Sequence, residues 1–121
     1  MLEFSGGCLC GSLRFKISAK PAYPHYCSCR QCQLWSGAPL VAWVEFPIAS
    51  LEYIGPGGHP RLFRSSEQTQ RGFCPECGST IFAFDEGSDN VSITLACLDG
   101  SPDIVPESQS YATSAPSWFD R

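Results

Sequence analysis

Hydrophobic and polar residues alternate over several short segments of the chain. In residues 12–18 every second residue is hydrophobic, and this period of two predicts a strand with one buried face. Residues 91–95 alternate in the same way and follow a polar turn at 85–90. We therefore expect them to form a hairpin with the strand predicted at 79–84, which precedes that turn.

Other segments are apolar on both faces or are bounded by turn residues. Residues 40–46 are almost continuously apolar, which predicts a central strand that is covered on both faces. Shorter strands are predicted at 51–54, 61–65 and 70–73, the last two as a pair around a polar turn. The glycine- and proline-rich residues 55–60 indicate a loop before that pair.

A helix is predicted only at residues 30–36, where Gly37 would end it and Pro39 would prevent it from continuing. Residues 20–24 indicate a turn, and the tail at 99–121 shows no periodicity. Several short strands with turn signals between them and almost no helical pattern indicate an all-β fold.

Composition and charge exclude two classes of partner. The 121 residues suit a single domain over 1–121, and they include only eight Lys and Arg, scattered along a chain of net charge -4. Nucleic-acid binding needs a basic stripe, so no nucleic-acid partner is expected. No apolar stretch approaches the ~20 residues of a membrane helix, and the N-terminus lacks the basic and apolar regions of a signal peptide. We therefore expect a cytoplasmic protein without a membrane partner.

The eight cysteines provide the candidate chemistry. In the cytoplasm, closely spaced cysteines are more often metal ligands than disulfides. Thiolates are soft ligands that suit zinc, and the groups below predict two zinc ions per chain. Seven of the eight cysteines fall into three groups with ligand spacing: Cys8-x-Cys10, Cys27-x-Cys29-x-x-Cys32 and Cys74-x-x-Cys77.

The outer and middle groups predict different kinds of metal site. The two outer pairs together supply four sulfurs, which predicts a closed, structural zinc site made of Cys8, Cys10, Cys74 and Cys77. The middle group supplies three sulfurs and predicts a second zinc with one position open to water or substrate, held by Cys27, Cys29 and Cys32. We expect function at this open position. The alternative is a second closed site, whose fourth ligand would be a carboxylate or one of His25, His59 and Cys97.

Single residues near the middle group are weaker candidates. Arg30 lies between two of the predicted ligands, and its charge would offset the thiolates or bind an anionic group of a substrate; a solvated surface arginine is the alternative. We expect His25 to be exposed and His59 to be solvated in its loop. Cys97 follows a predicted strand and is expected to be a small buried side chain.

The chain resembles the glutathione-dependent formaldehyde-activating enzyme family, which includes the centromere protein V-like proteins. The resemblance extends over almost the whole chain and rests on four motifs, which are Gly6-Gly7-Cys8-Leu9-Cys10-Gly11, Cys27-x-Cys29-x-x-Cys32, Ser36-Gly37-Ala38-Pro39 and Gly72-Phe73-Cys74-Pro75-x-Cys77-Gly78. It implies a β-tent fold of small coiled antiparallel sheets held by a four-cysteine zinc site. It also implies a second zinc on the central three cysteines, which is displaced or recruited when a thiol substrate binds.

The implied reaction joins glutathione to formaldehyde and is classed as a carbon–sulfur lyase reaction. This sequence departs from the family pattern where Ser28 and Gln109 replace histidines that are frequent in the family. It departs again where Ser117 separates Pro116 from Trp118. The predicted metal ligands are intact.

Two functions therefore compete. The first is an enzyme that joins a small thiol to an aldehyde through zinc held by the three central cysteines. The second is a non-catalytic interaction module with two structural zincs. An open coordination position at the second zinc favours the enzyme, and a fourth protein ligand there favours the module. A homo-oligomer is compatible with either function.

Overall fold

Ten strands form two sheets in the computed structural model, which describes residues 2–100 and 102–119. The smaller sheet contains, in spatial order, β1 (Phe4–Gly7), β2 (Arg14–Ile17) and β5 (Leu51–Tyr53). The larger sheet contains, in spatial order, β10 (Gln109–Ser110), β3 (Ala22–Cys27), β4 (Val41–Pro47), β9 (Asn90–Thr94), β8 (Thr80–Asp85), β7 (Thr69–Phe73) and β6 (Arg61–Arg64). The prediction of an all-β fold is confirmed.

Helical structure is sparse in the described residues. The α-helix α1 (Arg30–Ser36) has seven residues, and it lies where the sequence predicted it. Three short 3₁₀ turns complete the described elements, and they are η1 (Ile48–Ser50), η2 (Leu95–Cys97) and η3 (Ala112–Ser114). None of the helices in the described part of the chain has the length and apolar character that crossing a bilayer requires.

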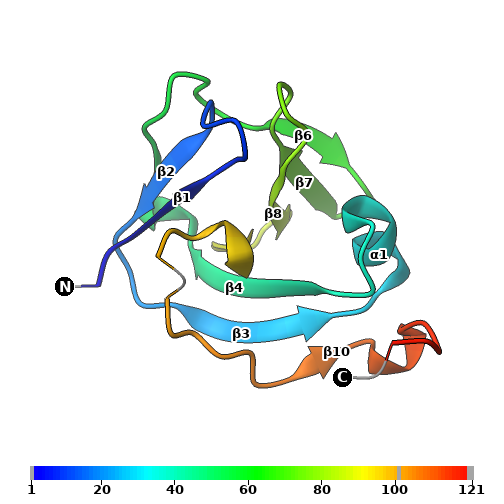
Figure 1. Ribbon diagram of the computed structural model, residues 1–121. Helices are drawn as coiled ribbons and strands as arrows, with labels where there is room; N and C mark the ends of the chain where they lie inside the picture. The colour runs from blue at the N-terminus through cyan, green and yellow to red at the C-terminus, as the bar shows by residue number, and fades with distance from the viewer. Residues whose placement is uncertain (1, 101, 120–121) are drawn as a thin grey trace.

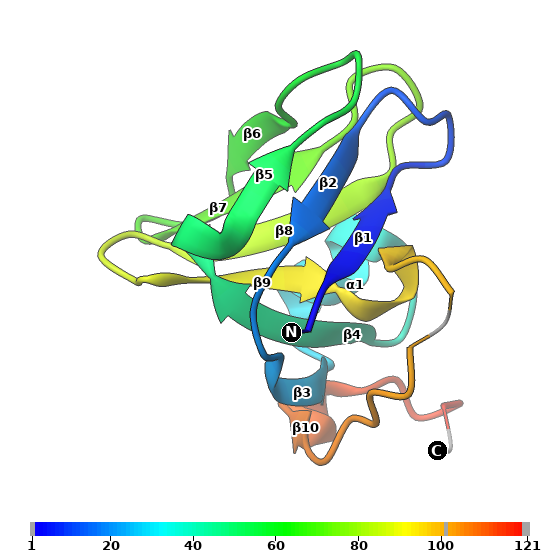
Figure 2. The ribbon, with the colours of Figure 1, turned by 90° about the vertical axis from the view of Figure 1, so that its left-hand side faces the viewer.

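The larger sheet curls around the smaller one (Figure 1). β3 and β4 run along the lower part of this view, and β8, β7 and β6 lie between its centre and its upper right, above and to the left of α1. β1 and β2 lie at the upper left. Turned by 90°, the molecule shows β1, β2 and β5 side by side above β9 and β4, with β10 at the opposite end beneath β3 (Figure 2). The two sheets thus enclose a common interior.

Buried side chains of both sheets form the main core. Phe15 and Ile17 of β2, Val44 and Phe46 of β4, and Ile93 of β9 have at most 1% of their surface exposed. Alternation in β2 places its polar residues on the other face, as the sequence predicted. β4 lies between β3 and β9, and it is apolar on both faces because each face packs against a different buried cluster.

The close approach of β1 to η2 requires a glycine. Gly6 is buried and forms an isolated bridge with Leu98. A Cβ atom at this position would clash with the carbonyl oxygen of Cys97 and would lie 2.7 Å from the ring of Phe15. We therefore expect Gly6→Ala to lower the free energy of unfolding by about 1–3 kcal/mol, because overpacking forces the backbone to shift. Denaturant unfolding measures this change, and a decrease below about 0.5 kcal/mol, the range of ordinary surface substitutions, would contradict it.

Two segments differ from their predicted structure. β3 begins at Ala22, inside the predicted turn, and its pairing with β4 shifts register between Ala22 and His25, where Tyr23 has a φ of 46°. The tail also contributes a strand, since β10 pairs in parallel with β3. Neither feature has a periodic signal, because one is a bulge and the other has only two residues.

The expectation that His25 is exposed is wrong, since only 8% of its surface is accessible. The irregularity in β3 stacks its ring on that of Tyr23, with ring centroids 4.1 Å apart. Nδ1 bonds to the carbonyl oxygen of Tyr23 at 2.8 Å. His59 is exposed, as expected.

Candidate metal centres

The first cysteine cluster joins two loops that are far apart in the sequence. Cys8 and Cys10 follow β1, Cys74 and Cys77 follow β7, and the four sulfurs all lie within 4.8 Å of one another. The Cys10 sulfur lies 3.6 Å from that of Cys8 and 3.8 Å from that of Cys74. Sulfurs bound at about 2.3 Å in a tetrahedron are about 3.8 Å apart. The spacing of this cluster therefore fits a four-coordinate metal ion.

Backbone turns and one serine hold the first cluster in shape. Gly78 has a φ of 81°, which lets its N–H bond to the carbonyl of Cys74 at 2.8 Å. The hydroxyl of Ser79 accepts from the N–H of Leu9 at 3.0 Å and lies 3.2 Å from the Cys77 sulfur. This hydroxyl, together with the Ser79 amide, lowers the pKa of Cys77 to about 5. Ser79 thus links the two loops and favours the thiolate form of Cys77.

The second cluster is built around the start of α1. Cys27 ends β3, Cys29 is the N-cap of α1, and Cys32 lies in its first turn. The Cys29 sulfur accepts the N–H of Cys32 at 3.3 Å, and Gly37, with a φ of 72°, ends the helix as predicted. The three sulfurs lie within 4.8 Å of one another. Cys27 and Cys32 are buried and Cys29 is half-buried, so solvent reaches the cluster from the side of Cys29.

No fourth ligand from the described residues joins the second cluster. Among residues 2–100 and 102–119, no further cysteine, histidine or carboxylate lies within the same distance of all three sulfurs. Of the three alternative ligands weighed from the sequence, His25 bonds to the backbone, His59 is exposed, and Cys97 lies in η2. Burial raises the pKa of Cys97 to about 11. The cluster thus presents three soft donors to a metal ion and leaves its fourth position without a ligand from the described chain.

The cation at the second cluster is Arg71 of β7, which the sequence analysis did not identify. Both terminal nitrogens of its guanidinium donate to the Cys32 sulfur, each at 3.7 Å. Arg30, the candidate chosen for its position in the sequence, is exposed, and its Nη1 donates to Gln33 at 3.2 Å. Arg71 is separated from the cluster by 39 residues, so only the pairing of the strands reveals the contact.

In the absence of a metal ion, hydrogen bonding makes the pKa values of Cys27 and Cys32 differ. The pKa of Cys32 falls to about 5, because the Cys27 thiol donates to its sulfur; Cys29 and the charge of Arg71 lower it further, against the effect of burial. The same hydrogen bond raises the pKa of Cys27, and burial adds to this increase. Cys32 is therefore the more readily ionised thiol of this pair.

The tail is fastened to the loop that carries the second cluster. Ser28 is completely buried, its N–H donates to the carbonyl of Ser110 at 2.9 Å, and its hydroxyl accepts from Gln109 at 2.8 Å. Gln33 donates from Nε2 to the carbonyls of Ser28 and Ser114, at 2.7 and 2.9 Å. Histidines are frequent at these two positions, 28 and 109, in the resembled family. Here Ser28 and Gln109 occupy them and form a hydrogen bond with each other.

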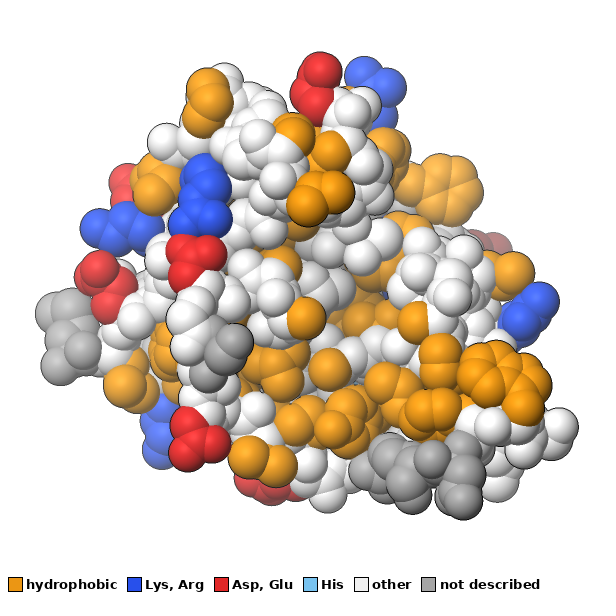
Figure 3. Space-filling view, in the orientation of Figure 1, with side chains coloured by type: hydrophobic (Ala, Val, Ile, Leu, Met, Phe, Trp, Pro, Cys, Tyr) orange, Lys and Arg blue, Asp and Glu red, His pale blue; other side chains and the backbone are white. Residues whose placement is uncertain are grey.

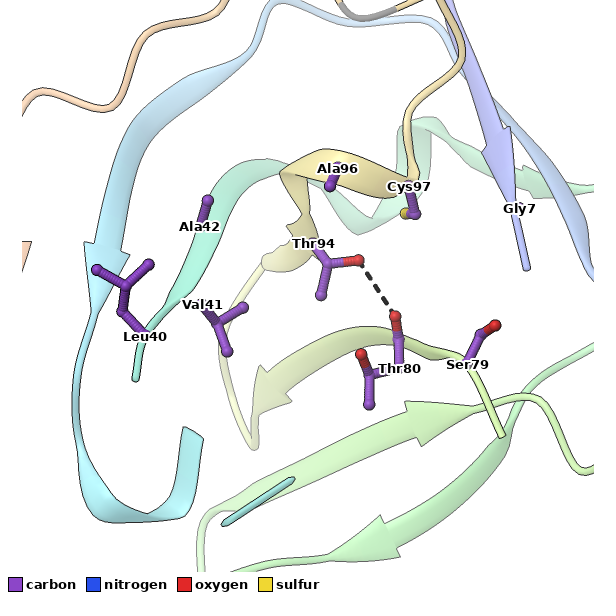
Figure 4. Close-up of a pocket in the computed structure, with 9 residues that line it drawn as sticks. All are labelled: Gly7, Leu40, Val41, Ala42, Ser79, Thr80, Thr94, Ala96 and Cys97. Carbon is purple, nitrogen blue, oxygen red and sulfur yellow. Dashed lines mark hydrogen bonds between the residues drawn. The ribbon is translucent and has the colours of Figure 1, made fainter. Parts of the chain in front are cut away.

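A cavity of about 390 Å³ is lined by residues of β1, β4, β8, β9 and η2 (Figure 4). Ser79, which contacts Cys77, lies on one of its walls. Val41, which packs with Cys27 and Cys32, lies on another. Thr94 lies between them and donates to the carbonyl of Thr80 at 3.2 Å. The lining consists of Gly7, Leu40, Val41, Ala42, Ser79, Thr80, Thr94, Ala96 and Cys97.

A second hollow, of about 500 Å³, lies between α1 and the tail, where Arg30 and Trp118 form part of its lining. The surface around these hollows has no basic stripe on the side shown in Figure 3. Hydrophobic side chains gather over β3, β4 and the tail in the lower part of this view, while the Lys and Arg side chains are scattered and those on the left lie beside Asp and Glu.

The sequence was also compared with known proteins. A sequence model described as glutathione-dependent formaldehyde-activating enzyme matches residues 3–114. The chain belongs to this family.

Two known proteins are similar to this chain. An uncharacterized lyase of Schizosaccharomyces pombe is 26% identical over 121 residues, which is 99% of this chain and 86% of that protein. The crystal structure of a Rhodobacter sphaeroides protein has a TM-score of 0.69 and 19% identity, and the similarity covers 88% of this chain and 99% of the other. At that identity the structural likeness shows the fold.

Proposed function

We propose that this family member is a zinc-dependent carbon–sulfur lyase that joins a small thiol, glutathione or a relative, to an aldehyde such as formaldehyde. The observation that carries the proposal is the second cluster, with three sulfurs, no fourth ligand from the described residues, and a half-buried cysteine on its solvent side. The family match over residues 3–114 supports the substrate class. The reducing cytoplasm is the proposed location, because it keeps cysteines as free thiols.

The two clusters would have different roles. Cys8, Cys10, Cys74 and Cys77 would bind a structural zinc, since four sulfurs close a tetrahedron. Cys27, Cys29 and Cys32 would hold the second zinc, and Arg30 would line the approach from the tail side. A zinc ion there would lower the pKa of a bound substrate thiol, which is ~8.5 when free, so that the thiolate is present at neutral pH.

The reaction forms one bond and moves one proton. The sulfur of the substrate thiol attacks the carbonyl carbon of the aldehyde, so that a carbon–sulfur bond forms and the π bond of the carbonyl breaks. The carbonyl oxygen then takes up a proton, equivalent to the one that the thiol has lost, and becomes a hydroxyl group. The chain's own contribution is to orient the thiol. The cavity whose wall includes Val41, a neighbour of Cys27 and Cys32, offers the hydroxyl groups of Thr80, Thr94 and Ser79 as polar contacts. Bringing the two reactants together in a fixed geometry supplies the rest of the acceleration.

Exchange spectroscopy by NMR tests this function. We expect zinc-loaded protein to accelerate the interconversion of glutathione and its formaldehyde adduct above the rate in buffer. In a separate calorimetric titration, glutathione should bind to the zinc-loaded protein. S-methylglutathione, which has no free thiol, should not bind. An exchange rate equal to that in buffer would overturn the proposal that this chain is an enzyme. Thiol binding without turnover would leave the interaction module as the function of the chain.

A further inference from the structure

A buried arginine lies against the second cluster without a carboxylate partner. Arg71 has 5% of its surface exposed. No carboxylate of residues 2–100 or 102–119 forms an ion pair with it. Burying a charge is unfavourable unless an opposite charge or several hydrogen bonds compensate for it. The group that faces its guanidinium is the Cys32 sulfur, which both terminal nitrogens contact at 3.7 Å.

Three further contacts fix the orientation of Arg71. Its Nε donates to the hydroxyl of Ser65 at 3.1 Å. Its guanidinium carbon lies 5.1 Å from the centre of the Trp35 ring, a cation–π distance. Trp35 in turn stacks on Trp43, with centroids 5.8 Å apart and planes inclined by 9°. Because Nε and the face of the guanidinium are occupied, its remaining donors are directed at Cys32.

We propose that Arg71 is a positioning residue that supplies the counter-charge of the second metal site and favours a thiolate over a neutral ligand at its open position. This inference rests on the proposed function. Three thiolates and one divalent ion leave one negative charge, and an incoming thiolate adds another. A guanidinium fixed against one of the ligating sulfurs offsets this charge, as charge-assisted hydrogen bonds to anions do. A neutral ligand adds no charge and gains nothing from Arg71.

The first test is the affinity of the second cluster for zinc, measured by competition with a chelator. We expect Arg71→Gln to lower this affinity about tenfold, because the substitution removes the positive charge and both guanidinium hydrogen bonds to the Cys32 sulfur. Arg71→Lys keeps the positive charge but loses the paired donors of the guanidinium. Its affinity for zinc should lie between those of the wild type and Arg71→Gln. Arg61→Gln, on the neighbouring exposed strand β6, removes the same charge from the surface and should stay within about twofold of the wild type.

The second test separates a charge effect from a structural one. Calorimetry compares 2-mercaptoethanol, which binds as a thiolate, with imidazole, which binds as a neutral ligand. We expect Arg71→Gln to weaken thiol binding about tenfold and imidazole binding less than twofold. Equal weakening of both ligands, or equal loss of zinc in Arg71→Gln, Arg71→Lys and Arg61→Gln, would overturn the proposal. If the wild type binds neither ligand, the open position and the proposed function are wrong, and the chelator competition still decides the role of Arg71 in metal binding.

Discussion

Replacing Cys74 with serine should remove the metal from the first cluster and destabilise the whole fold. Cys74 is 1% exposed and lies in the main core. Its sulfur closes a cluster whose loops are separated by 64 residues. Metal binding in such a site contributes directly to folding, because the unfolded chain has no preformed site. We expect a loss of about 3–5 kcal/mol, which lowers Tm by about 10 °C or more, measured by calorimetry together with the zinc content.

A matched variant controls for the chemical change itself. Cys97→Ser makes the same substitution at a half-buried cysteine outside both clusters. It should keep the full zinc content and lose no more than about 1 kcal/mol. The assignment of the first cluster is contradicted if Cys74→Ser keeps its metal and unfolds at the temperature of the wild type.

Replacing Cys29 with serine should abolish function while the fold is retained. This sulfur is the half-buried member of the second cluster, and without it two thiols remain to hold the metal. Serine at this position still caps α1, since its hydroxyl accepts the N–H that the Cys29 sulfur now accepts. We expect the second metal to be lost, thiol binding to disappear and the adduct-forming rate to fall to that in buffer. The domain should remain folded because the first cluster keeps its metal, and the loss of stability should be smaller than in Cys74→Ser.

The zinc content and the melting curve together test this prediction. Cys29→Ser should retain one metal per chain, in the first cluster, and Cys74→Ser should lose stability as well as metal. Unfolding of Cys29→Ser, or simultaneous loss of both metals, would show that the two clusters are not separate sites. Wild-type activity in Cys29→Ser would show that the second cluster takes no part in the reaction.

The strands could be predicted from the sequence because burial imposes a local period. The alternation in β2 and the hairpin of β8 and β9 are both present, and the apolar residues of β4 are buried on its two faces. β10 could not be predicted, since it has two residues and pairs with β3 across more than eighty positions of the chain. The bulge in β3 that buries His25 has no local signal either.

The two cysteine clusters follow from ligand spacing, because pairs separated by one or two residues must lie close together in space. The cation of the second cluster does not follow from it. Adjacency in the sequence favours Arg30, yet its side chain donates to Gln33. Arg71 reaches the cluster only because the fold brings β7 close to the Cys32 sulfur, and a single arginine in a polar strand gives no indication of that contact. Residue spacing therefore predicts ligands more readily than it predicts the side chains that surround them.

X-ray absorption at the zinc edge tests the central claim most directly, because it counts sulfur ligands without requiring turnover. One closed and one open site should give an average of about 3.5 sulfurs per zinc in the free protein. Adding glutathione should raise the average to about 4, and adding S-methylglutathione should leave it unchanged. An average of about 4 sulfurs before any thiol is added, with no change on adding glutathione, would contradict an open site that binds the substrate thiol.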